Sequence, residues 1–132
     1  MTIVWIYLGS LLTFLVVDAV WLTTVMRPLF ERHVGALLRP EIQLGAAAGF
    51  YLLYIVGILY FCTMPALKEN ALGLALFNAA ILGFLAYGTY EFTNMTTLRG
   101  WTWTMVISDT AWGMFLTTVT AGAGFAIGRA LN

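Results

Sequence analysis

Three carboxylates in strongly apolar surroundings are the residues of this sequence best placed to do chemistry. Asp18, Glu91 and Asp109 each lie within or at the end of a long hydrophobic stretch. Ionisable side chains in such stretches usually point into a helix bundle, toward a partner or toward water. Carboxylates that lie close together in a medium of low dielectric constant can share a proton or hold a cation. The three residues therefore predict a site for a proton, a cation or a small amphiphilic ligand.

Aromatic and polar residues accompany these carboxylates at helical spacing. The motif D-x-x-W occurs at 18–21 and again at 109–112, so each aspartate shares a helix face with an indole. The arginines at the rim are the expected cationic partners of the aspartates, Arg27 among them. In the alternative interpretation, the carboxylates only fix the register of the helices through hydrogen bonds. The candidate residues for ligand or ion binding are Asp18, Trp21, Tyr51, Tyr54, Tyr87, Tyr90, Glu91, Asn94, Arg99, Asp109 and Trp112.

The amino-acid composition indicates whether the chain folds in water or in a membrane. Of the 132 residues, 61% are hydrophobic and only 9% are charged, whereas soluble domains carry charge on roughly a quarter of their residues. Six basic residues balance six acidic ones, which excludes the positive field that nucleic-acid binding needs. We therefore expect a membrane protein in contact with lipids.

The sequence lacks the motifs of several common classes of enzyme and metal site. The sequence contains no G-x-S-x-G and no H-E-x-x-H motif. One cysteine and one histidine are too few for a zinc or haem site built within one chain, so neither a metal nor a cofactor is predicted. A bound lipid, or a pigment supplied by a partner, is compatible with this composition.

Four hydrophobic stretches, at about 2–25, 44–65, 72–92 and 103–127, match the roughly 20 apolar residues of a membrane-spanning helix. Short connectors force neighbouring helices to be antiparallel, so residues 1–132 are expected to form one all-α, four-helix, up-and-down transmembrane bundle. The longest connector is 26–43. Its apolar residues share one helical face, which predicts a short interfacial helix between the first two spans. These apolar residues are Leu29, Phe30, Val34, Leu37 and Leu38.

The basic residues predict the orientation of the bundle. The first and third connectors carry four arginines, and the second connector and the C-terminus carry two basic residues, Lys68 and Arg129. The positive-inside rule therefore places the first and third connectors in the cytoplasm and both termini in the periplasm. The four arginines are Arg27, Arg32, Arg39 and Arg99.

Several motifs together resemble one family. The run Y-G-T-Y-E-F-T-N at 87–94 and D-T-A-W-G at 109–113 are the most specific, and D-A-V-W at 18–21 and F-Y at 50–51 accompany them. The combination is similar to a small bacterial membrane-protein family, domain of unknown function 2177. The resemblance covers essentially the whole chain and implies a four-span, multi-pass protein of the bacterial inner membrane. It implies no activity, so the roles of the three carboxylates rest on the physical argument.

Three classes of function follow from the sequence, in decreasing order of expectation. The first is an accessory or interaction subunit beside a larger membrane complex, favoured by minimal loops and by small residues spaced for helix packing, as in Gly45–Gly49 and Gly124–Gly128. Such packing is expected mainly within the bundle, with a dimer seam as the alternative. The second is a transport component that binds a proton, a cation or an amphiphile and needs an oligomer to enclose a pathway. The third is an enzyme acting on a lipid or isoprenoid, with Asp18 and Asp109 as acid and base.

Overall fold

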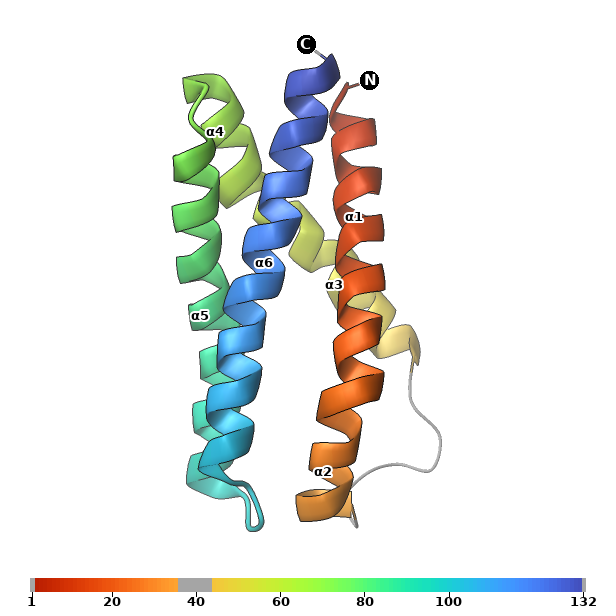
Figure 1. Cartoon of the computed structure of the whole chain (residues 1–132), viewed down its shortest axis with the longest axis vertical. Helices are drawn as coiled ribbons and strands as arrows, with labels where there is room; N and C mark the ends of the chain where they lie inside the picture. Colours follow the sequence, from red (N-terminus) through yellow and green to blue (C-terminus); the bar gives the residue numbers. More distant parts are fainter. Residues whose placement is uncertain (1, 36–43, 132) are drawn as a thin grey trace.

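The computed structural model describes residues 2–35 and 44–131, which form four long antiparallel helices (Figure 1). All four are long and apolar enough to cross a membrane, which confirms the predicted all-α membrane bundle. In chain order the elements are α1 (Thr2–Trp21), a π-helical turn (Leu22–Met26), α2 (Arg27–Val34), α3 (Leu44–Ile58), a second π-helical turn (Leu59–Thr63), α4 (Met64–Glu69), α5 (Leu72–Thr97) and α6 (Trp103–Leu131).

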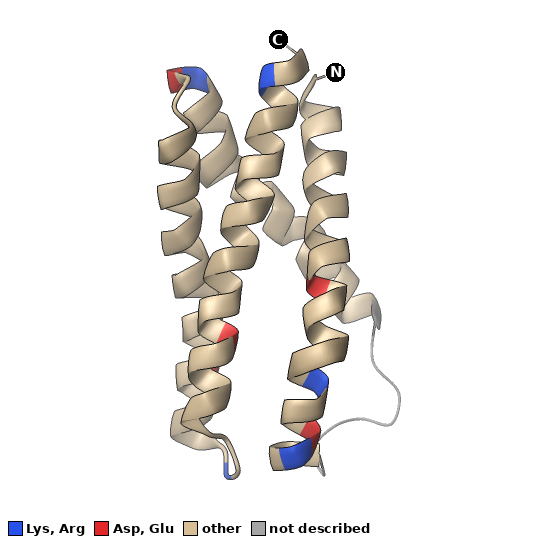
Figure 2. Cartoon of the chain, viewed as in Figure 1, with Lys and Arg blue, Asp and Glu red and all other residues tan. Residues whose placement is uncertain are grey.

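The two ends of the bundle differ in what they carry. Both termini and the turn between α4 and α5 lie at one end, here called the terminal end (Figure 1). Helix α2 and the connection between α5 and α6 lie at the other, here called the loop end. Figure 2 shows basic residues near both ends and acidic residues also farther inside the bundle. Which end faces the cytoplasm stays a prediction.

The predicted interfacial helix takes a different form in the structure. Helix α2 is present at 27–34, but it continues α1 through the π-helical turn without a break, so residues 2–34 form a single helical rod. Over these residues the helix is present but is not separate, because the π-helical turn accommodates Pro28 without ending the helix. Leu37, Leu38 and Arg39 lie outside the described residues.

Each π-helical turn ends two residues before a proline, Pro28 or Pro65. Proline lacks an N–H and crowds the carbonyl four residues earlier, and a widened turn relieves that crowding. The carbonyl that Pro65 leaves without its helical partner belongs to Phe61. The Asn78 side chain of α5 donates to it at 3.1 Å, so the irregular turn is tied to the neighbouring helix.

Close packing of α6 against its neighbours depends on glycines. A Cβ on Gly83 of α5 would lie 2.5 Å from the Gly113 carbonyl oxygen of α6, so these two backbones are in direct contact. Gly124 and Gly128 of α6 are likewise packed against side chains of other helices, in agreement with the predicted role of small residues. Gly45 and Gly49 meet nothing within 4 Å, so this pair does not serve packing within the described bundle.

A second, smaller core lies at the loop end and joins α2 to the start of α6. Val34, Trp101, Met105 and Val106 are buried together there. Gly100 in the connection has a φ of 83°, and a Cβ on it would lie 2.8 Å from the His33 carbonyl oxygen. The α5–α6 connection is therefore held against the end of α2, and this contact positions Trp101 for the site described next.

Candidate functional site

Asp18 is buried in the middle of the first rod, with 8% of its surface exposed. The indole N–H of Trp112 on α6 donates to its Oδ1 at 3.2 Å. The Tyr51 side chain of α3 also lies near this carboxylate. Three helices thus converge on Asp18, as the sequence predicts for a residue that points into the bundle.

The two D-x-x-W motifs meet across the interface of α1 and α6. The rings of Trp21 and Trp112 stack with their centroids 4.5 Å apart and their planes 4° apart. Trp112 donates to Asp18, the aspartate of the other motif, and not to Asp109. The buried Nε1 of Trp21 has no hydrogen-bond partner among the described residues. The tryptophan of the second motif therefore binds the aspartate of the first. The indole N–H of Trp21 remains available as a donor.

Glu91 is the most deeply buried of the three carboxylates, with 0% of its surface exposed. The indole N–H of Trp101 donates to its Oε1 at 2.9 Å. Its other oxygen, Oε2, has no hydrogen-bond donor within the described part of the chain. A buried acceptor without a donor is uncommon, because its desolvation is not compensated. This oxygen therefore points to a proton or a ligand that the site accepts.

Asp109 of α6 lies between the other two carboxylates. Its carboxyl group neighbours that of Glu91, and Asp18 lies within electrostatic range. Two neighbouring carboxyl groups can share one proton, and such a proton would be the donor that the second oxygen of Glu91 lacks. The neighbouring Thr110, buried to 7% exposure, has an Oγ1 with no partner among residues 2–35 and 44–131. We call Asp18, Glu91 and Asp109 the carboxylate cluster.

The predicted tyrosines and Asn94 either lie near the carboxylate cluster or pair elsewhere. Tyr87 is near both aspartates, and Tyr90 is near Glu91, Asp109 and Asn94. Tyr54 instead pairs with Thr117 at 2.9 Å between the two oxygens, with its ring edge-on to Tyr87.

The arginines are not where the sequence places them. Arg27 pairs with Glu31 on the exposed side of α2, with Nε and Oε1 3.0 Å apart. Arg99 is exposed in the α5–α6 connection. No ion pair joins a basic side chain to the carboxylate cluster in the described ranges. The expected rim partners are thus absent from this part of the structure, and the cluster is held by aromatic donors.

Sequence reasoning missed two residues of the site. Trp101 lies just before the fourth hydrophobic stretch, a position typical of an aromatic residue at the membrane interface, but it is buried and donates to Glu91. Thr110 gives no signal beyond its position next to Asp109. The contact of Trp101 with Glu91 depends on how the α5–α6 connection turns, which hydrophobic periodicity does not encode. Only the ten-residue separation of these two residues across a turn that contains Gly100 hints at it.

The arrangement favours ligands that bring positive charge or hydrogen-bond donors. Asp18 accepts a hydrogen bond from Trp112, and Glu91 accepts one from Trp101. Together with Asp109, these carboxylates place acceptor oxygens on α1, α5 and α6. No group of three His, Cys, Asp or Glu side chains among the described residues is arranged to hold a metal ion. Acceptors lined by aromatic rings suit protons and organic cations, since cations are attracted to the faces of such rings.

Comparison with known proteins gives a family and no function. The family model described as "Predicted membrane protein (DUF2177)" matches residues 3–126. No curated protein and no solved structure matches the chain. The match includes all four long helices and every member of the carboxylate cluster. The chain therefore belongs to the DUF2177 family of membrane proteins.

Proposed function

We propose that the protein is a cation-binding component of membrane transport, and that its carboxylate cluster takes up either a proton or the ammonium group of an amphiphilic amine. The observation that carries this proposal is the geometry of Glu91. Its carboxylate is fully buried, one oxygen is held by Trp101, and the other has no donor in the described structure. A positively charged donor would compensate the desolvation of that oxygen.

The surroundings of the cluster favour an organic cation as well as a proton. The half-buried Trp21 and Trp112 and the tyrosines of α3 and α5 give an aromatic lining, to which ammonium groups are attracted. A proton and an ammonium group would compete for the same oxygens. Competition of this kind is the physical basis of exchange, in which binding of the amine releases a proton. Enclosing a pathway would require more than one copy of this four-helix chain.

The test is calorimetric titration of the purified protein in detergent with butylammonium, a primary alkylammonium that keeps its positive charge and its N–H donors well above neutral pH. The affinity is expected to rise with pH, because protons leave the carboxylates that the cation needs. Glu91→Gln keeps the size of the side chain and an acceptor for Trp101 but removes the charge. It is expected to weaken binding by about tenfold or more.

Glu31→Gln is the matched control, because Glu31 is exposed and pairs with Arg27. It should leave the affinity unchanged. Thermal unfolding of each variant checks that the fold is retained. If Glu91→Gln and Asp109→Asn both fold and bind butylammonium as the natural chain does, the cluster only fixes the helix register and the proposal is wrong.

A second candidate is the accessory subunit, and the open face of α3 favours it. Gly45 and Gly49 present a small-residue surface with nothing within 4 Å, which is the type of surface on which a transmembrane helix of another subunit packs.

The expected result for this candidate is that Gly49→Leu reduces a stoichiometric partner recovered from native membranes by affinity purification. Gly73→Leu, at an open position on α5, should not reduce it. Recovery of the chain alone, in natural and variant forms, would contradict the accessory role without affecting the cation-binding proposal.

A further inference from the structure

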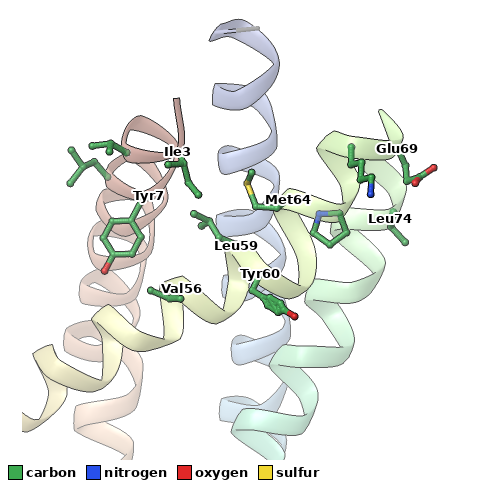
Figure 3. A pocket seen from close by; sticks show the side chains of 12 residues that line it. Ile3, Tyr7, Val56, Leu59, Tyr60, Met64, Glu69 and Leu74 are labelled. Atoms are coloured by element: carbon green, nitrogen blue, oxygen red, sulfur yellow. The ribbon is translucent and has the colours of Figure 1, made fainter. Parts of the chain in front are cut away.

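A groove runs along the membrane-facing side of the bundle in its terminal half, away from the carboxylate cluster. Its volume is about 1000 Å³, at the upper end of the roughly 300–1,000 Å³ of ligand pockets. The first turns of α1 form one wall, and the second helix of the bundle, with the start of α5, forms the other (Figure 3). Apart from its rim and the tyrosines, the lining is aliphatic.

The groove is wedge-shaped because α3 crosses the bundle obliquely. Near its middle α3 contacts α1, where the Tyr7 hydroxyl donates to the Leu52 carbonyl at 2.9 Å. From this crossing the chain leans toward α5, so that α4 and the beginning of α1 are separated at the terminal end (Figure 1). The wedge is thus closed deep in the bundle and open toward the membrane surface and the lipid.

The length of the wedge corresponds to one leaflet. The lining residues of this wall run from Val56 to Lys68, about 18 Å along the helix at about 1.5 Å per residue and less along the membrane normal, because this helix is oblique. Half of the hydrocarbon core of a bilayer is about 15 Å. Val56 and Tyr60 lie at the deep end and are exposed although they border the groove. An acyl chain that enters from the surface would reach the crossing of α1 and α3.

The rim adds charge to this apolar wedge. Lys68 and Glu69, at the end of α4, both line the groove and are both exposed. A neighbouring cation and anion at the level of the headgroups complement a lipid headgroup that itself carries both signs. The phosphate of phosphatidylethanolamine would be held by Lys68 and its ammonium group by Glu69. A purely anionic headgroup, such as that of phosphatidylglycerol, would meet Glu69 with repulsion.

We propose that this groove is a binding site for one phosphatidylethanolamine molecule, with an acyl chain in the wedge between α1 and α3 and its headgroup on Lys68 and Glu69. The lipid fills the space that the oblique course of α3 leaves open and joins α1 to α4. This site is separate from the carboxylate cluster and does not depend on the cation-binding proposal.

The test is native mass spectrometry of the full chain in detergent, titrated with dioleoyl phosphatidylethanolamine or with dioleoyl phosphatidylglycerol. One phosphatidylethanolamine per chain is expected, with phosphatidylglycerol bound more weakly. Lys68→Gln should weaken the binding of phosphatidylethanolamine by about tenfold. Val56→Trp, which fills the deep end of the wedge, should weaken the binding of both lipids.

Matched controls separate the groove from the rest of the surface. Arg129→Gln removes a cation at the same end of the bundle that bonds Asn70, and Leu53→Trp adds an indole at an exposed position of α3 outside the groove. Neither should change the binding of lipid. Lipid that binds without fixed stoichiometry, equally in all variants, or with equal affinity for both headgroups would overturn the proposal. An increase of the unfolding temperature by phosphatidylethanolamine that is lost in Lys68→Gln would provide independent support.

Discussion

Replacing Gly83 by alanine is expected to force α5 away from α6 and to lower the free energy of unfolding by about 1–3 kcal/mol. The added Cβ would lie 2.5 Å from the Gly113 carbonyl oxygen and 2.8 Å from the Met114 Cα. Both are backbone atoms of α6, so no change of rotamer relieves the clash and one helix must shift. Because Asp109 and Glu91 lie on these same two helices, the shift would also change the distance between their carboxylates.

The measurement is equilibrium unfolding in mixed micelles, followed by circular dichroism. Gly73→Ala is the matched control, since Gly73 is exposed on α5 and its Cβ would meet nothing within 4 Å. This control should leave stability unchanged or raise it by up to about 1 kcal/mol, because alanine favours the helix over glycine. Equal stability of the two variants would show that the close approach of α5 and α6 is not required.

Phe14→Ala is expected to lower the free energy of unfolding by about 3–5 kcal/mol. Phe14 is completely buried, and its ring lies edge-on to Tyr51 and Tyr54, with centroids 5.1 and 5.9 Å away. In a membrane the packing of side chains, rather than exclusion from water, holds helices together, so a cavity here removes contacts that lipid does not replace. Tyr51 would also lose the ring that keeps its hydroxyl near Asp18.

Leu12→Ala provides the comparison, because Leu12 lies on the same helix and is 65% exposed. Its truncation should change stability by less than about 1 kcal/mol. The same unfolding experiment checks both variants. Weaker binding of butylammonium to Phe14→Ala than to Leu12→Ala would show that Tyr51 must be held in place for the cluster to bind. A loss of stability no greater than that of Leu12→Ala would contradict the central role of Phe14.

Hydropathy predicts the spans well because a membrane requires each segment to be apolar over its whole length. The carboxylates could also be found from the sequence, since charge inside such segments is conspicuous. Their partners could not. The two tryptophans of the D-x-x-W motifs lie on antiparallel helices, and only the relative rotation of α1 and α6 decides that Trp112 bonds Asp18 and stacks on Trp21.

The continuous first rod illustrates a further limit of the sequence. Pro28 and the charges around it suggest a break and a change of direction, and the pattern of 26–35 fits an interfacial helix equally well. The π-helical turn absorbs the proline without ending the helix, and packing of Val34 against Trp101 then holds α2 in line. Long-range contacts of this kind outweigh the local preferences of the sequence, and hydrophobic periodicity does not predict them.

The bond between Trp101 and Glu91 connects the interior of the membrane with its surface. Trp101 belongs to the connection between α5 and α6, and its ring packs edge-on against Phe30 of α2, with centroids 5.0 Å apart. A ligand that takes Glu91 away from this indole would release the connection and α2 together. A change at this buried carboxylate would thus reach the exposed end of the first rod through a single side chain.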